Sequence, residues 1–260
     1  MIQYKNELRA VMYVDDLEAT AAYYADVMGL EKVHEWNNGP EDKGCVFKVV
    51  GGGHIELIVG KPLIPQGATS LWMEAKDIDG VYSTIEKTPD NGIYEAVTDK
   101  YYHARVFRVV DPDGNATFVC AYEPDLVPYT KDAQRGNFFK DEFRCVLFVE
   151  DLEACFKFYT EVLEMPCTYS WNEGPNDSGY KVKAAGTGAY IENLHRYPLV
   201  PQGATTVMVE AEDVDAAYAA IMAKDGIRMV EDIQDKPYGV RSFQILDPDD
   251  NGVIIFSYLK

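Results

Sequence analysis

Apolar residues follow two alternating periods along the chain, one typical of strands and one of helices. Residues 8–14 read as a strand, and Leu17, Ala21 and Tyr24 then recur at the spacing of one helix face, with Asp15 or Asp16 available as the cap. Short strands are next expected at 31–36, 45–50 and 54–60, separated by segments rich in Asn, Gly and Pro. This pattern predicts a βαβββ unit.

A second unit of the same shape follows directly. Residues 70–75 read as a strand, and 77–87 as a helix whose apolar stripe includes Ile78, Val81 and Ile85. Three more strands are expected at 94–97, 104–110 and 117–122, with a tight Asp-Pro-Asp-Gly-Asn turn before the last.

Both units then occur again, at an offset of about 135 residues. Asp16-Leu17-Glu18-Ala19 returns as Asp151-Leu152-Glu153-Ala154. Trp36-Asn37 returns as Trp171-Asn172, and the Asp111-Pro112-Asp113 turn as Asp247-Pro248-Asp249. A repeat of this length is a duplicated domain, so we expect domains at 1–123 and 138–260 with a linker at 124–137. An active constellation should then appear twice.

Composition narrows the class of protein. The chain has 260 residues, 47% of them hydrophobic, and a formal net charge of −19. That charge disfavours nucleic acid and anionic membranes as partners. No apolar run is long enough to span a bilayer, the N-terminus lacks the apolar stretch of a signal peptide, and five cysteines show no paired spacing. We therefore expect a cytoplasmic protein with free thiols.

These features resemble the vicinal oxygen chelate superfamily, which includes glyoxalases, bleomycin-resistance proteins and extradiol dioxygenases. The resemblance rests on the strand followed by Val14-Asp15-Asp16-Leu17, the Tyr23-Tyr24 pair, the terminal Asp-Pro-Asp-x-Asn turns and the Tyr-x-x-Arg-x-Phe stretches that begin at Tyr102 and Tyr238. It implies an α+β fold: four βαβββ units forming two domains with curved, cup-shaped mixed sheets. It also implies that the chain pairs its own halves, as a monomer with pseudo-dimeric halves, or else forms a homodimer.

The resemblance further implies four metal-ligand positions, which His or Glu occupies in the enzymes. On the first, fourth, fifth and last strands of the first copy these positions hold Arg9, Glu56, Ser70 and Phe118. The second copy holds Arg144, Glu192, Thr206 and Ile254. Arginine has no lone pair to give a cation, and Phe and Ile have no donor atom. We therefore expect no cofactor, although a divalent ion near Glu56, which shares a strand face with His54, or near Glu192 stays open.

Arginine and glutamate at two of these positions suggest a guanidinium–carboxylate pair in each cup. Such a pair either fills the cup or grips a polar ligand, and the sequence leaves both interpretations open. Trp36 and Trp171 either stack on a flat ligand or belong to the core, and Tyr102 and Tyr238 either line the opening or lie on the surface. The candidate ligand-binding residues are Arg9, Trp36, Glu56, Ser70, Tyr102, Phe118, Arg144, Trp171, Glu192, Thr206, Tyr238 and Ile254.

The leading hypothesis is a metal-free protein that binds a small, cationic or aromatic organic molecule, as bleomycin-resistance proteins sequester drugs. The alternative is a metal-dependent glyoxalase-like lyase, epimerase or dioxygenase with a divergent site. A non-catalytic scaffold, with its cups filled by side chains, is the third interpretation. No residue stands out as catalytic.

Overall fold

The structure of the chain is a computed structural model. It describes residues 4–27, 29–60, 69–75, 77–89, 91–100, 104–110, 112, 114–122, 139–174, 178–185, 188–195, 205–236, 239–246 and 250–259. Tyr102, Tyr238 and the linker expected at 124–137 lie outside these ranges.

Sixteen strands and four α-helices in these ranges follow the expected order. The first copy contains β1 (Tyr4–Tyr13), α1 (Leu17–Ala22), β2 (Glu31–Asn37), β3 (Lys43–Lys48), β4 (Gly53–Val59), β5 (Ser70–Ala75), α2 (Ile78–Glu86), β6 (Ile93–Lys100), β7 (Ala104–Val110) and β8 (Ala116–Tyr122). The second contains β9 (Phe139–Phe148), α3 (Leu152–Lys157), β10 (Cys167–Asn172), β11 (Ser178–Ala185), β12 (Ala189–His195), β13 (Thr206–Ala211), α4 (Val214–Met222), β14 (Arg228–Asp235), β15 (Val240–Leu246) and β16 (Gly252–Tyr258).

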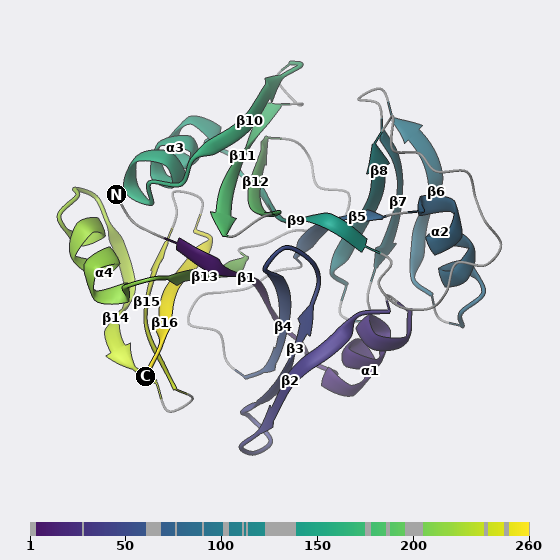
Figure 1. Cartoon of the computed structure of the whole chain (residues 1–260), viewed down its shortest axis with the longest axis horizontal. Helices are drawn as coiled ribbons and strands as arrows, with labels where there is room; N and C mark the ends of the chain where they lie inside the picture. The colour runs from purple at the N-terminus through teal and green to yellow at the C-terminus, as the bar shows by residue number, and fades with distance from the viewer. Residues whose placement is uncertain are drawn as a thin grey trace.

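The strands form two eight-stranded mixed sheets, and each sheet takes one unit from each copy (Figure 1). Sheet 1 has the order β14-β15-β16-β13-β1-β4-β3-β2, and sheet 2 has the order β10-β11-β12-β9-β5-β8-β7-β6. The copies join through antiparallel pairs, β1 with β13 and β5 with β9. The predicted α+β fold of four βαβββ units is confirmed, and each sheet contains strands from both copies.

Each helix begins at an aspartate. The side chains of Asp16, Asp77, Asp151 and Asp213 accept a hydrogen bond from the backbone N–H three residues later, at 2.9–3.0 Å. Asp16 is therefore the cap where the sequence left Asp15 or Asp16 open. Among the described residues no helix is long and apolar enough to cross a membrane.

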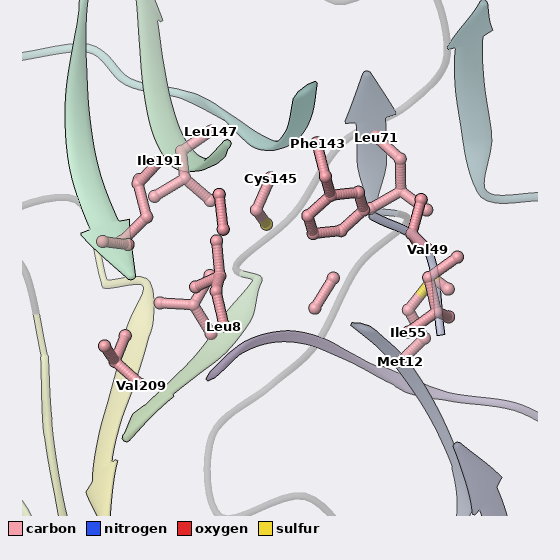
Figure 2. Packing of buried hydrophobic residues seen from close by; sticks show 14 of the residues in the cluster. Leu8, Met12, Val49, Ile55, Leu71, Phe143, Cys145, Leu147, Ile191 and Val209 are labelled. Atoms are coloured by element: carbon pink, nitrogen blue, oxygen red, sulfur yellow. The ribbon is translucent and has the colours of Figure 1, made fainter. Parts of the chain in front are cut away.

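The helices cover one face of each sheet, and a single hydrophobic core joins these two faces. Figure 2 shows Leu8, Ile55, Phe143 and Ile191 among the residues that meet where the sheets pack. The Phe143 ring lies on Gly53, where a Cβ atom would approach it to 2.4 Å. The opposite faces, which we call inner face 1 (sheet 1) and inner face 2 (sheet 2), carry separate clusters that include no helix residue.

Two motifs that carried the family resemblance have structural roles. The buried Asn115 and Asn251 accept hydrogen bonds from the backbone N–H groups of Thr69 and Thr205, at 2.9 and 3.0 Å. Each asparagine thereby fixes the turn before the last strand of its copy against the start of a neighbouring strand. On the helix side of sheet 2, Arg105 forms ion pairs with Asp79 and Asp99, at 2.6 and 3.0 Å.

Candidate functional site

Arg9 is the centre of inner face 1, and all three of its guanidinium nitrogens are bonded. Nη1 donates to Glu56 at 2.9 Å, Nη2 donates to the Tyr258 hydroxyl at 2.6 Å, and Nε donates to Glu7. The Tyr258 hydroxyl in turn donates to Glu7 at 3.0 Å. The guanidinium also lies 5.4 Å from the centre of the Phe256 ring. The side chains of Arg9 and Glu56 are only 13% and 11% exposed, so this ion pair is largely buried from solvent.

The charges of this network shift the pKa of its members. Burial opposes the charge of Arg9, but the carboxylates of Glu56 and Glu7 outweigh it and raise its pKa above the ordinary value. Burial and the nearby Glu7 raise the pKa of Tyr258 to about 12. Burial lowers the pKa of His54, which lies directly across from Arg9. At neutral pH this surface therefore holds a charged guanidinium, neutral tyrosine and uncharged histidine.

Inner face 2 holds the corresponding pair in different surroundings. Arg144 Nη1 donates to Glu192 at 2.6 Å, and both side chains are buried. The guanidinium of Arg144 lies 4.9 Å from the centre of the Trp72 ring. The Trp72 and Phe118 rings are stacked, with 5.6 Å between their centres. The guanidinium of Arg108 lies over the Phe118 ring, 5.3 Å from its centre.

These residues form a row because their strands are neighbours in register. Arg144 on β9 is opposite Trp72 on β5, Trp72 is opposite Phe118 on β8, and Phe118 is opposite Arg108 on β7. The row ends at β6, where Glu95 accepts from Arg108 Nε at 2.7 Å. An aromatic pair thus lies between two guanidinium groups.

Eight of the candidate residues occupy the four aligned positions, and each inner face combines two positions from each copy. Inner face 1 brings together Arg9, Glu56, Thr206 and Ile254. Inner face 2 brings together Ser70, Phe118, Arg144 and Glu192. The guanidinium–carboxylate pairs suggested by the sequence are present on both faces. Tyr102 and Tyr238 lie outside the described residues.

The two repeated tryptophans lie across a glycine on the neighbouring strand. Trp36 is opposite Gly44, and Trp171 is opposite Gly179. A Cβ atom on either glycine would come within 2.3–2.5 Å of the indole ring, so only glycine leaves room for it. Trp171 packs against the inner face 2 cluster, whereas Trp36 donates its ring N–H to Asp42 at 3.0 Å.

Three residues of inner face 2 were missed at the level of sequence. Trp72 and Arg108 belong to the row described above, and Lys181 lies directly across from Glu192. Strand alternation was a sufficient signal for Trp72, which is two residues beyond the candidate Ser70 and so shares its face. Arg108 could be recognised as part of this row only from the strand register, which cannot be derived from the sequence alone.

The chain belongs to the Glyoxalase/Bleomycin resistance protein/Dioxygenase superfamily, whose family model matches residues 8–117 and 143–255. Glyoxalase I from Zea mays is similar over 97% of this chain and 92% of its own, with 18% identity and a TM-score of 0.72. A putative dioxygenase from Bacillus subtilis is similar over 99% and 86%, with 15% identity and a TM-score of 0.69. The cppA protein from Streptococcus pneumoniae covers 99% and 100% at 9% identity, with a TM-score of 0.56. No curated protein matches the sequence.

At these sequence identities the structural similarity shows the fold alone. Whether this chain can bind the metal ion of the family's enzymes depends on its own residues. Each inner face offers one carboxylate at the four aligned positions, and a guanidinium already binds it. The remaining positions supply a hydroxyl and a hydrocarbon side chain. Within the described ranges, no group of three or more His, Cys, Asp or Glu side chains is arranged to hold a metal ion. These residues do not fit a divalent ion.

Proposed function

We propose that this chain binds small organic molecules on its inner faces without a metal ion, in the manner of the bleomycin-resistance branch of its superfamily. The observation that carries the proposal is the buried Arg–Glu pair at the centre of each inner face, Arg9–Glu56 and Arg144–Glu192. Burying an ion pair costs desolvation energy that an apolar filling would avoid. A polar ligand that contacts the pair gives a reason for keeping it on both faces.

Cationic aromatic molecules are the first candidates for inner face 1. Glu7, Glu56, Glu210 and Glu231 lie on its strands, and the whole chain has a net charge of −19. Carboxylates on a partly buried surface attract cations more strongly than carboxylates in water. Tyr258 and Phe256 add aromatic surface beside Arg9.

Intrinsic fluorescence tests the proposal directly, because all three tryptophans lie on the strands of the inner faces. Trp36 belongs to sheet 1, while Trp72 and Trp171 belong to sheet 2. Titration with bleomycin and with planar cationic antibiotics should produce a saturable change in emission and matching heat in calorimetry. Absence of both signals with every compound would contradict the proposal.

Variants and elemental analysis complete the test. Glu56→Gln should weaken a cationic ligand of inner face 1 by about tenfold, since it removes one charge-assisted contact. Glu212→Gln, which changes the same charge at an exposed position, should leave binding unchanged. Stoichiometric zinc, nickel, manganese or iron in the purified protein would instead favour the metal-dependent lyase, epimerase or dioxygenase.

A further inference from the structure

The two inner faces differ in charge at matched positions of the repeat. Arg108 on inner face 2 corresponds to Gln244 on inner face 1, since each lies across from the residue at the last-strand position, Phe118 or Ile254. Lys181 corresponds to Val46, since each lies across from the paired glutamate, Glu192 or Glu56. Inner face 2 therefore has two additional cations in a chain that is strongly acidic overall.

The two inner faces also differ in the number of aromatic residues along the row that begins at the paired arginine. Inner face 2 has Trp72 and Phe118 between its arginines, whereas inner face 1 has Met208 and Ile254 after Arg9. Trp72 and Phe118 are nearly parallel, with 18° between their rings. Because Arg144 and Arg108 lie over the outer faces of these rings, the pair offers its ring edges to a ligand. A flat aromatic ligand gains more from contact with such edges than from contact with flexible aliphatic side chains.

Arg108 keeps hydrogen-bonding capacity that the described residues do not use. Its side chain is 8% exposed, and Nε donates to Glu95. Among the described residues, neither terminal nitrogen of Arg108 has a hydrogen-bond partner. By contrast, all three nitrogens of Arg9 on inner face 1 are bonded. A guanidinium with two open donors is suited to a carboxylate.

Ser70 provides a second, independent observation on the same face. Its hydroxyl oxygen is fully buried and has no hydrogen-bond partner in the described part of the chain. Ser70 lies two residues before Trp72 on β5, and Arg108 lies on the far side of Phe118. An unpaired buried hydroxyl is costly unless a ligand or water completes it.

We propose that inner face 2 binds a planar anion of the aromatic carboxylate class, lying against the ring edges of Trp72 and Phe118, with its carboxylate at Arg108. Inner face 1 then takes a ligand of different charge, so the two inner faces have diverged in specificity. This inference rests on the proposed binding function and specifies the ligand class of one face.

Three naphthalene compounds with the same ring system and substituents of different charge test it: 1-naphthoate, 1-naphthamide and 1-naphthylmethylammonium. Binding is measured by calorimetry, and the face is identified from the indole N–H signals of the ¹⁵N-labelled protein, assigned with single Trp→Phe variants. We expect naphthoate to shift the signals of Trp72 and Trp171 but not that of Trp36, and to bind at least tenfold more tightly than the ammonium compound.

The repeat supplies matched variants. Arg108→Gln and Lys181→Val introduce the residues that the other copy holds, and Arg108→Gln should weaken naphthoate by about tenfold or more. Arg105→Gln, on the opposite face of the same strand, is the control and should change the affinity less than twofold. Circular dichroism confirms folding, and retention of naphthoate affinity by Lys181→Val as well as Arg108→Gln would overturn the inference.

The outcomes separate this inference from the proposed function. Tighter binding of the ammonium compound at Trp72, or a naphthoate shift confined to Trp36, overturns the inference. If cationic antibiotics bind while naphthoate does not, the inference fails and the proposed function stands. If none of these compounds binds, both fail.

Discussion

At the scale of single residues, matched positions of the two copies show which side chains the fold requires. Asn115 and Asn251 are both buried and both bind a backbone N–H. By contrast, Asn193 is fully buried, and neither atom of its amide has a partner among the described residues. Its counterpart in the first copy is Leu57, which is equally buried in the core. Asn193 therefore places an unpaired polar group at a core position where the first copy has an apolar side chain.

Asn193→Leu should stabilise the protein. The substitution removes a buried amide without partners and restores the residue that the matched position accommodates, so the free energy of unfolding should rise by roughly 1–3 kcal/mol. Urea unfolding followed by circular dichroism measures the change. Asn115→Leu is the control and should destabilise the chain, because it leaves the Thr69 N–H without its acceptor. A less stable Asn193→Leu protein would show that the amide has a partner in solution.

At the scale of elements, most strands and helices could be predicted from the alternation of apolar residues. The expected strand at 70–75 is β5, and the expected helix at 77–87 contains α2. The π-helical segments Tyr23–Val27 and Phe158–Val162 were not expected. Each follows an α-helix directly and begins with two buried aromatic residues in edge contact, at 5.5 and 5.2 Å. A local pattern of apolar positions does not distinguish such a widened turn from a regular helix.

The residues of the candidate site could be predicted in part, but their grouping in space could not. Arg9, Glu56, Arg144 and Glu192 could be chosen because the family resemblance implies ligand positions on the first and fourth strands of each copy, where these residues stand. Their grouping depends on which strands pair across the copies, and this is set by contacts between distant segments. The row through Trp72 and Arg108 therefore appeared only with the strand register.

Gly44→Ala and Gly179→Ala should disrupt the hairpins β2–β3 and β10–β11. The added Cβ atom would meet the indole at 2.3 or 2.5 Å and a backbone oxygen at 2.4 or 2.6 Å, so the tryptophan must leave its place. We expect a loss of about 1–3 kcal/mol in stability and emission shifted to the red. Gly60→Ala, with no contact closer than 3.3 Å, is the control. Unchanged emission in both variants would contradict this packing.

At the scale of the whole molecule, the pairing of units across the copies decides what each half can do alone. β1 and β9 occupy equivalent places in the repeat, and so do β5 and β13. In the intact chain β1 pairs with β13, and β9 pairs with β5. A half of the chain thus has two strands whose partners are missing. Exposed edges of this length favour pairing with another chain.

Residues 138–260 expressed alone should therefore form a dimer. β9 of one copy would pair with β13 of the other, placing Arg144 opposite Met208, as Arg9 is opposite Met208 in the intact chain. Because the exchange occurs twice around a twofold axis, both open edges close at once and no further chain can add. Light scattering after size exclusion measures the mass, with the intact chain as reference. A folded monomer of this half would show that its two units pair with each other, contrary to the sheet order of the intact protein.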